Sequence, residues 1–470
     1  MTKKIRRIPK RRASADKTKI VKKNIKNKPD FNLPSKESMQ IEKYKRELRR
    51  TRNSASFRMG NTIISNLIKP WKIILLPFRL ITLSWSLVAE RLGYKKAPYY
   101  NFSLDDSLEK RDCVVLFPTN GVGFGHFTRL LAIGKRIKNI SPKTEVVFFT
   151  TMPTLHILKE QGDFIAYHMP GRKYYDGMDA RAWNTIVEEF LSNVLEIHRP
   201  KLFIFDGAYP YRGMLNSIIG RRKLNKMWLR RATFKKSSME TPIETINCFD
   251  SIIYPMDSVE HEFKNEEKYN ANIISCNPII MLNKNELEPR EEVLARLGIP
   301  QESIVVYVQL GAGNINDINS EIGMTMDALA KNKDIYVVLG ESMIGKRLEI
   351  NGERIRIIRD YPNSRFFNAF DFAIMAAGYN SFHEAISFSL PTIFYPNLDT
   401  GKDDQYARAK GAENIGAMVV IKQRKMNKVT AAIERLCDPK VRLRMKKKIK
   451  KLQYSNGAEQ LAKYIVESVD

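Results

Sequence analysis

The chain has 470 residues and a formal net charge of +28, with 79 Lys and Arg against 51 Asp and Glu. This length leaves room for two or three ordinary domains, each large enough to bury its own core. The charge is uneven, because residues 1–100 carry 27 basic and 6 acidic residues. The basicity therefore belongs to the amino-terminal segment, which excludes a uniformly basic globular body.

Residues 1–53 are dense in charge and offer little apolar surface to bury, so we expect a basic arm that is disordered or loosely helical. No signal peptide is evident, because the short basic start is not followed by a continuous apolar segment with a cleavage site. The four cysteines are scattered without C-x-x-C or other metal-binding spacing. These features predict a reducing, cytoplasmic location.

Residues 57–96 mix Ile, Leu, Phe and Trp with Lys and Arg. We predict amphipathic helices that lie in the membrane interface, with the basic arm facing anionic headgroups. The aromatic anchors would be Trp71, Phe78 and Trp85. A true membrane span over residues 71–88 stays open, as does packing of this face on the protein's own body. Nucleic acid is disfavoured as a partner, because the tail adjoins this apolar segment and its first 30 residues contain no aromatic side chain.

From residue 111 onward, short apolar runs alternate with helical patterns. Strand candidates lie at 113–118, 145–151, 163–169, 201–206, 303–310, 334–340, 354–358, 370–376, 392–396 and 417–421. Apolar residues from Trp183 to Leu195 recur at helical spacing, which predicts a helix packed on a sheet. Strands that alternate with helices indicate βαβ units, so each half should be an open, mostly parallel, doubly wound α/β sheet. In two such domains facing across a cleft, ligands bind outside the carboxyl ends of the strands.

The stretch GVGFGHFTR at 121–129 follows the first strand candidate and opens a helical pattern. Glycines on such a turn let a ligand approach the backbone, and the N–H groups that begin a helix attract anions. The pattern is not the G-x-G-x-x-G of dinucleotide sites, because His126 stands where the third glycine belongs. It indicates a ligand loop that carries an imidazole. A tight turn that only permits close packing of helix on strand is the alternative.

The second half carries polar side chains after two predicted strands. Gly378 and Ser381 lie where a helix should begin, and free N–H groups there could hold a diphosphate. Glu384 follows in the same helix and could accept two hydrogen bonds from a vicinal diol such as a ribose. Asp404 and Gln405 offer groups that suit sugar hydroxyls. Alternatively, Glu384 only favours the helix dipole and Asp404 only caps the next helix.

This second-half stretch resembles the donor-binding domain of the GT-B nucleotide-sugar glycosyltransferases, in the group that contains the peptidoglycan N-acetylglucosaminyltransferase, plant galactolipid synthases and UDP-glucuronosyltransferases. Their donor segment reads approximately G-G-x-x-S/T-x-x-E-A, then G-x-P, a strand with Pro, and D/E-Q. The matching residues here are Ala377-Gly378, Ser381, Glu384-Ala385, Pro391, Pro396 and Asp404-Gln405. The first-half loop resembles the same group's G-x-G-H-x-x-R loop, with one extra residue before the histidine. Its matching residues are Gly123, Gly125, His126 and Arg129.

The resemblance covers roughly residues 111–455 and implies two Rossmann-like domains that face each other across a cleft. Ala377 and Ser389 replace glycines of the family pattern, which would tighten the donor loop. Arg408 replaces an asparagine, which could alter the choice of sugar. Retaining relatives carry a second glutamate eight positions before the first, where this chain has Ala376. The resemblance therefore implies an inverting transfer.

The resemblance also implies a role for each matching residue. Glu384 would bind the ribose, while Asp404 and Gln405 would read the sugar. The backbone near Tyr361 would meet the uracil. The diphosphate would be held by Gly311, Gly313, Asn314, Gly378 and Ser381. His126 would remove the acceptor proton as general base, or would only orient the donor or acceptor. Helix N-termini can stabilise a leaving diphosphate and the candidate loops lack a D-x-D motif, so we predict no metal and no cofactor besides the UDP-sugar donor.

On the acceptor side, Asp206, Tyr209 and Arg212 follow a predicted strand, where contacts with an acceptor would be made. The predicted set comprises Gly123, Gly125, Arg129, Asp206, Tyr209, Arg212, Arg230 and Arg231. The adjacent pair Arg230 and Arg231 could bind an acidic acceptor or a lipid-linked phosphate by charge-assisted hydrogen bonds. Alternatively, residues 226–236 are an ordinary solvated face.

The sequence thus predicts a peripheral enzyme on the cytoplasmic face of the membrane that moves a sugar from a UDP-sugar to a cell-envelope or capsule glycan, which could be lipid-linked. A UDP-sugar 2-epimerase or a teichoic-acid-type glycerophosphotransferase would share the fold. A non-catalytic scaffold that binds membrane or nucleic acid through its basic arm is the alternative from another class. The predicted parts are an arm (1–53), interfacial helices (54–100), an acceptor-side domain (101–270), a donor-binding domain (271–455) and a final helix (456–470).

Overall fold

The computed structural model describes residues 36–68, 70–92, 94–95, 109–119, 124–153, 155–231, 241–258, 269–311, 318–343, 347, 350–400 and 403–469. Residues 1–35 of the predicted arm lie outside this described part. So do Gly123, Gly313 and Asn314 of the predicted ligand loops.

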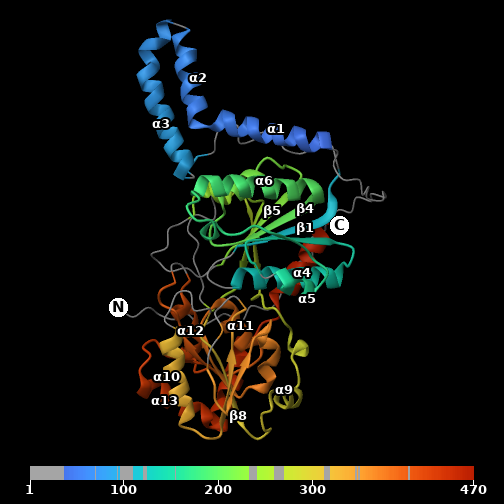
Figure 1. The fold of residues 1–470 in the computed structure, drawn as a ribbon, viewed down its shortest axis with the longest axis vertical. Coiled ribbons are helices and arrows are strands. Elements are labelled where there is room, and N and C mark those ends of the chain that lie inside the picture. Colours follow the sequence, from blue (N-terminus) through green and yellow to red (C-terminus); the bar gives the residue numbers. More distant parts are fainter. Residues whose placement is uncertain are drawn as a thin grey trace. The chain divides into compact units, whose positions relative to one another are not determined.

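Seven parallel strands form the first sheet, in the order β3-β2-β1-β4-β5-β6-β7. Their bounds are β1 Arg111–Pro118, β2 Glu145–Thr150, β3 Ile165–His168, β4 Pro200–Asp206, β5 Asn225–Leu229, β6 Ser251–Pro255 and β7 Asn272–Cys276. The helices between them are α4 Gly125–Ile140, α5 Leu155–Gln161, η2 Arg172–Tyr174, α6 Ala180–His198, α7 Arg212–Ile218 and α8 Ile243–Ile246. Figure 1 shows α6 over one face of this sheet and α4 with α5 over the other.

Strand β1 shows why this sheet needs helices on both faces. Val114 and Leu116 are buried in the cluster that includes α4, whereas Val115 and Phe117 are buried in the cluster that includes α6. A strand buried on both faces reads as a continuous apolar run, since successive side chains point to opposite faces. The run CVVLFP is therefore a central strand.

The second sheet has six parallel strands in the order β10-β9-β8-β11-β12-β13, which repeats the doubly wound order of the first six strands of the other sheet. Its strands are β8 Ile304–Gln309, β9 Ile335–Gly340, β10 Ile355–Ile358, β11 Phe372–Ala376, β12 Thr392–Tyr395 and β13 Val419–Val420. The accompanying helices are η4 Lys284–Glu286, α9 Arg290–Leu297, α10 Ile318–Ala330, η5 Asn363–Ala369, α11 Tyr379–Ser387, α12 Gln405–Asn414, α13 Met426–Cys437, α14 Pro439–Ile449 and η6 Lys450–Leu452.

Two doubly wound α/β sheets confirm the predicted fold class, and every predicted strand coincides with an observed one. Strands β5, β6 and β7 were not predicted. The interpretation of residues 226–236 as a solvated face is wrong for its first part, because Lys226 and Trp228 are buried in the central strand β5. The last helix, α15 (Gly457–Val469), packs on α4 and β7, so the chain returns from the second sheet to the first.

Three helical segments precede the first sheet. They are α1 Lys36–Asn53, α2 Ala55–Leu67 and the pair η1 Pro70–Leu75 with α3 Leu76–Leu92. Residues 36–53 belong to the arm that was expected to be disordered or loosely helical, and they form α1, whose Arg49 Nη2–H donates to the carbonyl of Asn216 in α7 over 2.7 Å. We call residues 55–92 the α2–α3 hairpin. By length and composition alone, residues 71–92 could cross a membrane, since the most apolar 18 residues of this segment have a mean hydropathy of 1.6 and none of those 18 is buried.

Candidate active site

His126, Asp206 and Arg129 meet where β1 and β4 end. His126 lies in the first turn of α4, and Asp206 is the last residue of β4, whose partner in the ladder is Pro118 at the end of β1. Nδ1 of His126 lies 2.6 Å from Oδ1 of Asp206. Arg129 donates to both oxygens of the same carboxylate, from Nε over 3.0 Å and from Nη2 over 2.8 Å. The structure thus brings together three residues that the sequence placed on the acceptor side.

The partners of His126 set its tautomer and its pKa. Asp206 is completely buried, and burial alone would raise its pKa, but the charge of Arg129 and the hydrogen bonds from His126 and Arg129 outweigh that effect and hold the pKa below its usual value. Nδ1 of His126 lies close both to Asp206 and to Arg129 Nη2, the latter at 2.9 Å. In the tautomer that carries its proton on Nδ1, the ionised Asp206 accepts that proton and the lone pair of the imidazole lies on Nε2. Burial also lowers the pKa of His126 below 6.5, despite the opposing pull of Asp206. His126 is therefore neutral at physiological pH and can accept a proton.

The start of α11, from the second sheet, lies against this triad. The guanidinium carbon of Arg129 is 5.2 Å from the ring centroid of Tyr379, the first residue of α11. Gly378 is the N-cap and provides no side-chain cap, and α4 also begins without one. A Cβ at Gly378 would meet nothing within 4 Å. Uncapped N–H groups beside open space are the arrangement that binds a phosphate, which agrees with the roles expected for Gly378 and for Ser381 one turn on.

Glu384 lies on the inner side of α11. Its Oε1 accepts a hydrogen bond from Ser364 Oγ over 3.0 Å, and the side chain is buried. Burial raises the pKa of Glu384 to about 7, and the hydrogen bond from Ser364 offsets only part of this rise. A carboxylate held so close to its protonated form gains from hydroxyl donors such as those of a ribose. Glu384 was predicted to bind a ribose, and its position after the Gly378 turn is compatible with that role.

Tyr361 connects the two sheets. Its hydroxyl lies 2.7 Å from Oγ1 of Thr128 in α4, and its ring centroid is 5.3 Å from that of Phe124. The Tyr361 carbonyl accepts a hydrogen bond from Gln161 Nε2 over 3.1 Å. The backbone that was expected to meet the uracil is therefore held to α5 through its carbonyl oxygen, while the Tyr361 side chain contacts α4.

Arg408 does not face the predicted sugar site. It is fully buried, and its guanidinium donates to Asp257 from Nε and Nη2 and to Asp403 Oδ1 over 2.6 Å. His383 Nε2 lies 3.2 Å from the same Asp257. Asp403 also pairs with Arg231 of the first domain over 3.4 Å. The expectation that Arg408 alters the choice of sugar has no support in these contacts, because its charge holds two carboxylates in place.

The two residues predicted to read the sugar are partly engaged. Asp404 is the N-cap of α12, where its Oδ1 accepts from the Ala407 N–H over 2.9 Å. Gln405 Oε1 accepts from the Asn397 N–H over 3.0 Å. The capping alternative is thus realised for Asp404, while its second oxygen and the Gln405 amide group remain the atoms that could meet a sugar. Gly311, expected to help hold the diphosphate, lies two residues after the end of β8. Its φ of +111° is a backbone conformation that favours glycine.

The remaining acceptor-side residues separate into two groups. Arg230 follows Leu229, the residue of β5 that pairs with Asp206 of β4. Its guanidinium carbon is 5.2 Å from the centroid of the Trp228 ring. Tyr209, in the loop after β4, is exposed. Arg212 instead donates from Nη2 to the carbonyls of Glu90 and Arg91 at the end of α3, over 3.1 and 3.3 Å. It fastens the hairpin to the body, and a contact with the acceptor stays a prediction.

The two departures from the glycine pattern differ in their consequences. Ala377 is buried beside the donor loop, and its carbonyl accepts from Arg408 Nη1 over 3.1 Å. Ser389 lies past the other end of α11 with φ +55°, so a glycine there would serve the helix end and not the donor loop. Gln453 Nε2 donates to Ser389 Oγ over 2.8 Å.

A cluster with metal-ligand chemistry lies elsewhere. Within the described residues, donor atoms of Cys113, Glu145 and His198 all lie within 4.8 Å of one another. They lie near the amino ends of β1 and β2 and at the end of α6, whereas His126 lies near the carboxyl ends of the strands. His198 Nδ1 pairs with Glu145 Oε1 over 3.1 Å. The group is therefore separate from the candidate active site.

Sequence reasoning missed Asp257, Ser364 and Thr128 as parts of the site. Each is hydrogen-bonded to a residue from another segment, and the two partners lie between 20 and 233 positions apart in the chain. A strand-end position after β6 was the available signal for Asp257, but β6 was not predicted. Ser364 and Thr128 offered no sequence pattern that distinguishes them from the chain's other serines and threonines, although both are buried.

Comparisons with known proteins agree with this geometry. Residues 360–461 match the model of the glycosyltransferase family 28 C-terminal domain. A UDP-N-acetylglucosamine–N-acetylmuramyl-(pentapeptide) pyrophosphoryl-undecaprenol N-acetylglucosamine transferase of Aquifex aeolicus is 27% identical over 37% of this chain and 50% of its own length. The enzyme of the same name from Acetivibrio thermocellus is 25% identical over 64% of this chain and 83% of its own length. The crystal structure of the glycotransferase of kitacinnamycin covers 77% of this chain and all of its own, with TM-score 0.54 and 12% identity.

Proposed function

Because the chain is a nucleotide-sugar glycosyltransferase with the GT-B fold, we propose that it transfers a sugar from a UDP-sugar to a lipid-linked acceptor of the cell envelope, with inversion and without a metal. The single observation that carries the mechanism is the His126–Asp206–Arg129 triad beside the uncapped start of α11. In this proposal the neutral imidazole faces the helix start that would hold the diphosphate.

The proposed reaction is one displacement at the anomeric carbon. The acceptor hydroxyl attacks C1 of the sugar while Nε2 of His126 takes its proton, and the bond from C1 to the diphosphate oxygen breaks. Asp206 stabilises the imidazolium that forms, as an ionised partner on Nδ1 does. UDP leaves with the bonding electron pair, and the N–H groups at the start of α11 stabilise its charge. Attack from the face opposite the leaving group inverts C1.

The choice of substrate class follows from the relatives and the chain's own charges. The names of the two similar bacterial transferases give a UDP-sugar as their donor and a polyprenyl diphosphate as their acceptor. Arg230 and Arg231, after β5, could meet such an acidic acceptor by charge-assisted hydrogen bonds. A location on the cytoplasmic face of the membrane would supply both substrates. An epimerase or a glycerophosphotransferase of the same fold is less well supported, because the matched relatives are transferases.

The test is to incubate the purified full-length protein with a panel of nucleotide sugars and a short-chain polyprenyl diphosphate glycan, and to measure released nucleotide and glycosylated product. We expect release of UDP that depends on the acceptor, continues in EDTA and is lost in His126→Ala. Product analysis should show inversion at C1. Turnover that is equal in His126→Ala, or that requires a divalent ion, would remove the proposed base or the proposed metal independence.

A further inference from the structure

The α2–α3 hairpin has its polarity reversed relative to a helix pair in water. Its outer surface is apolar, and the exposed fractions reach 84% for Ile74, 70% for Trp71 and 73% for Trp85. The other large exposed side chains of this surface are Phe57, Met59, Ile63, Ile64, Leu67, Ile68, Ile73, Leu75, Phe78, Ile81, Val88 and Leu92. A soluble protein rarely exposes so continuous an apolar surface without a partner.

The inner surface between the two helices is polar instead. Arg58 donates to both oxygens of Glu90, over 2.5 and 3.1 Å. Arg79 Nη1 donates to Asn66 Oδ1 over 2.8 Å, and Asn66 Nδ2 donates to the Thr62 carbonyl over 2.6 Å. Asn66 and Glu90 are buried. Hydrogen-bonding polar groups to one another while turning apolar groups outward is what a hydrocarbon environment requires, because no water is present there to satisfy them.

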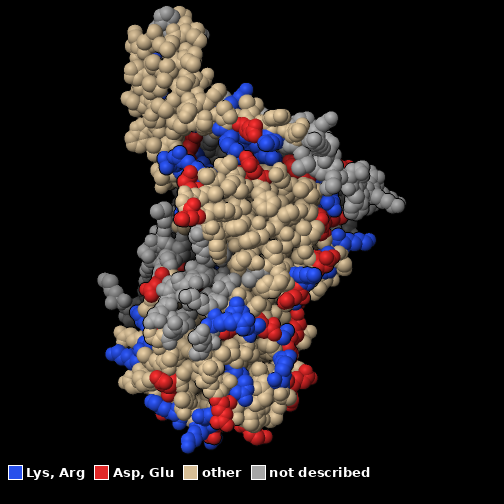
Figure 2. All heavy atoms as spheres, viewed as in Figure 1, with Lys and Arg blue, Asp and Glu red and all other residues tan. Residues whose placement is uncertain are grey.

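The distribution of charged side chains on the surface also fits a hydrocarbon environment around the hairpin. On the face drawn in Figure 2 the described part of the hairpin is almost entirely tan, whereas both signs of charge appear at α1 and on the body. Among the described charged residues of the hairpin, Arg58, Lys72 and Arg79 are only partly exposed and Glu90 is buried, while the exposed Arg91 lies at the end of α3 beside the body. An interfacial helix would instead present a charged face to water along its length.

Both ends of the hairpin are fastened to the same body. Arg49, just before the hairpin, bonds the α7 backbone, and Arg212 of α7 bonds the carbonyl of Glu90 near its end. The Arg58–Glu90 and Arg79–Asn66 pairs show that the two arms run antiparallel. Helix α2 has 13 residues, about 20 Å, against about 30 Å for a bilayer's hydrocarbon core. The hairpin can therefore enter one leaflet and return, with both ends on one side.

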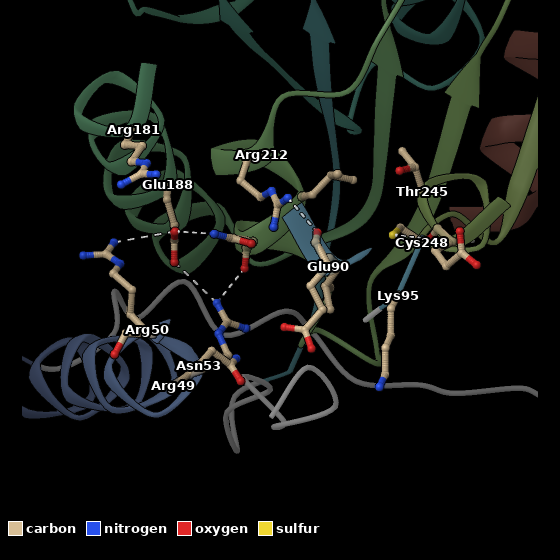
Figure 3. A pocket seen from close by; sticks show the side chains of 15 residues that line it. Arg49, Arg50, Asn53, Glu90, Lys95, Arg181, Glu188, Arg212, Thr245 and Cys248 are labelled. Carbon is tan, nitrogen blue, oxygen red and sulfur yellow. Dashed lines mark hydrogen bonds and ion pairs between the residues drawn. The ribbon is translucent and has the colours of Figure 1, made fainter. Parts of the chain in front are cut away.

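Cationic side chains collect at the hairpin's base. A cavity of about 470 Å³ between α1, the end of α3 and the body is lined by Arg49, Arg50, Lys95, Arg181 and Arg212, together with Glu90, Glu188 and Glu244. Figure 3 shows Glu188 between Arg49 and Arg50, with which it pairs. Glu90 forms an ion pair with Arg58, so the basic side chains that line the cavity outnumber the remaining acidic ones. This is the level at which headgroup phosphates would lie if the hairpin were inserted.

We propose that the α2–α3 hairpin inserts tip-first into one leaflet of an anionic bilayer, with the turn around Trp71 and Ile74 deepest and headgroup phosphates at the cationic base. This deepens the proposed membrane placement and rests on it, but it does not depend on the proposed chemistry. The sequence predicted helices that lie flat in the membrane interface, whereas here the two helices would enter the hydrocarbon.

Quenching of tryptophan fluorescence by brominated lipids tests the orientation. The full-length protein is mixed with vesicles of phosphatidylcholine and phosphatidylglycerol brominated either near the headgroup or near the chain end. Trp183 and Trp228 are buried in the body, so Trp71→Phe and Trp85→Phe isolate each hairpin signal. Trp85 follows the end of η1 at Leu75 by ten residues, about 15 Å along the helix. We expect Trp71 to be quenched best by deep bromines and Trp85 by shallow ones. Equal shallow quenching of both would show a flat orientation and overturn the proposal.

A charge at the tip tests insertion independently. Ile74→Asp should lower partition into the same vesicles by roughly 100-fold, the effect of a carboxylate in hydrocarbon, without changing the unfolding temperature. Ile415→Asp is the control, since Ile415 is also exposed but lies at the end of α12. Equal binding of Ile74→Asp and wild type would contradict insertion. So would a stable dimer in lipid-free buffer that Ile74→Asp dissociates, because a second copy would then cover this surface. UDP release measured in detergent on the same variants keeps a failure of insertion distinct from a failure of the proposed transfer.

Discussion

Nδ1 of His126 lies 2.6 Å from Oδ1 of Asp206, although 80 positions separate them in the chain. The two residues meet because β1 and β4 are neighbours at the point where the strand order of the first sheet reverses. Ligands of doubly wound sheets bind at this switch point. The pair thus stands where the fold itself provides a site.

The first prediction concerns pH. His126 must be neutral to accept a proton, and its pKa lies below 6.5, so kcat/KM should fall only as pH drops below about 6.5 and stay level above it. In Asp206→Asn the charge that raises the pKa of His126 is gone, so the acid limb should move to lower pH. We expect kcat to fall by roughly 100-fold to 10,000-fold as the ionised partner of the imidazolium is lost.

Initial rates from pH 5 to 9, with unfolding temperatures at each pH, would measure this. His126→Ala serves as the reference that lacks the titrating base. An acid limb that persists in His126→Ala would show that another group titrates and would exclude His126 as the base.

The second prediction contrasts two glycines. A Cβ at Gly378 meets nothing within 4 Å, and φ there is −61°, so Gly378→Ala should leave the free energy of unfolding nearly unchanged. The added methyl group would stand where the diphosphate approaches, and UDP affinity should fall by roughly tenfold, about 1.4 kcal/mol. Calorimetric titration with UDP and thermal unfolding give the two quantities.

Gly213 is the matched control for this experiment. A Cβ there would lie 2.0 Å from the backbone oxygen of Asn184, because α6 and α7 pack closely at that point. Gly213→Ala should therefore destabilise the fold by about 1–3 kcal/mol and leave UDP affinity unchanged at a temperature where it is folded. If Gly378→Ala bound UDP as wild type does, the assignment of the diphosphate to the start of α11 would be wrong.

Sequence patterns predicted the ten strands that are long apolar runs, because strands buried on both faces carry little else. They missed β5 to β7, where Lys226, Asn225 and the exposed Asn272 interrupt the apolar character of short strands near one edge. The periodic helix α6 and the helix start at Gly378 were predicted for the same reason: their signals are local.

The partners within the site could not be predicted, because each bond joins segments that only the folded chain brings together. Asp206 was recognised as a strand-end acid, but its pairing with His126 depends on the adjacency of β1 and β4. Arg408 is a case where the fold adds contacts that the sequence could not show. Its place in the family pattern suggested an effect on the choice of sugar, and the structure shows that it is buried against Asp257 and Asp403.

The third prediction concerns Glu384, whose pKa burial raises from 4.5 to about 7. The folded chain then binds this proton more tightly than the unfolded chain. The stability due to this group is therefore full below pH 4.5 and is lost as pH rises through about 7. Glu384→Gln, which resembles the protonated form, should unfold at a higher temperature than wild type at pH 8. The gain is at most on the order of 3 kcal/mol and should vanish near pH 4.5.

The same substitution should weaken UDP binding by about tenfold or more, since hydrogen bonds from ribose hydroxyls to a charged acceptor are lost. Ser364→Ala provides the comparison, because it removes the donor to Glu384 but leaves the carboxylate. A variant Glu384→Gln that is less stable at pH 8, or that binds UDP unchanged, would refute the assigned role.

The fourth prediction returns to Arg408, where the related family has asparagine. Arg408→Asn would leave the buried carboxylates of Asp257 and Asp403 without their main counter-charge, and the pKa of Asp257 is held far below its usual value mainly by that arginine against the effect of burial. Breaking a buried ion pair in this way costs about 3–5 kcal/mol. We therefore expect a large loss of stability in urea unfolding and the same preference among nucleotide sugars. Arg296→Asn is the control, since Arg296 is half exposed in its pair with Glu288 and should cost less than about 1 kcal/mol. Wild-type stability in Arg408→Asn together with a new sugar preference would restore the interpretation that this residue selects the sugar.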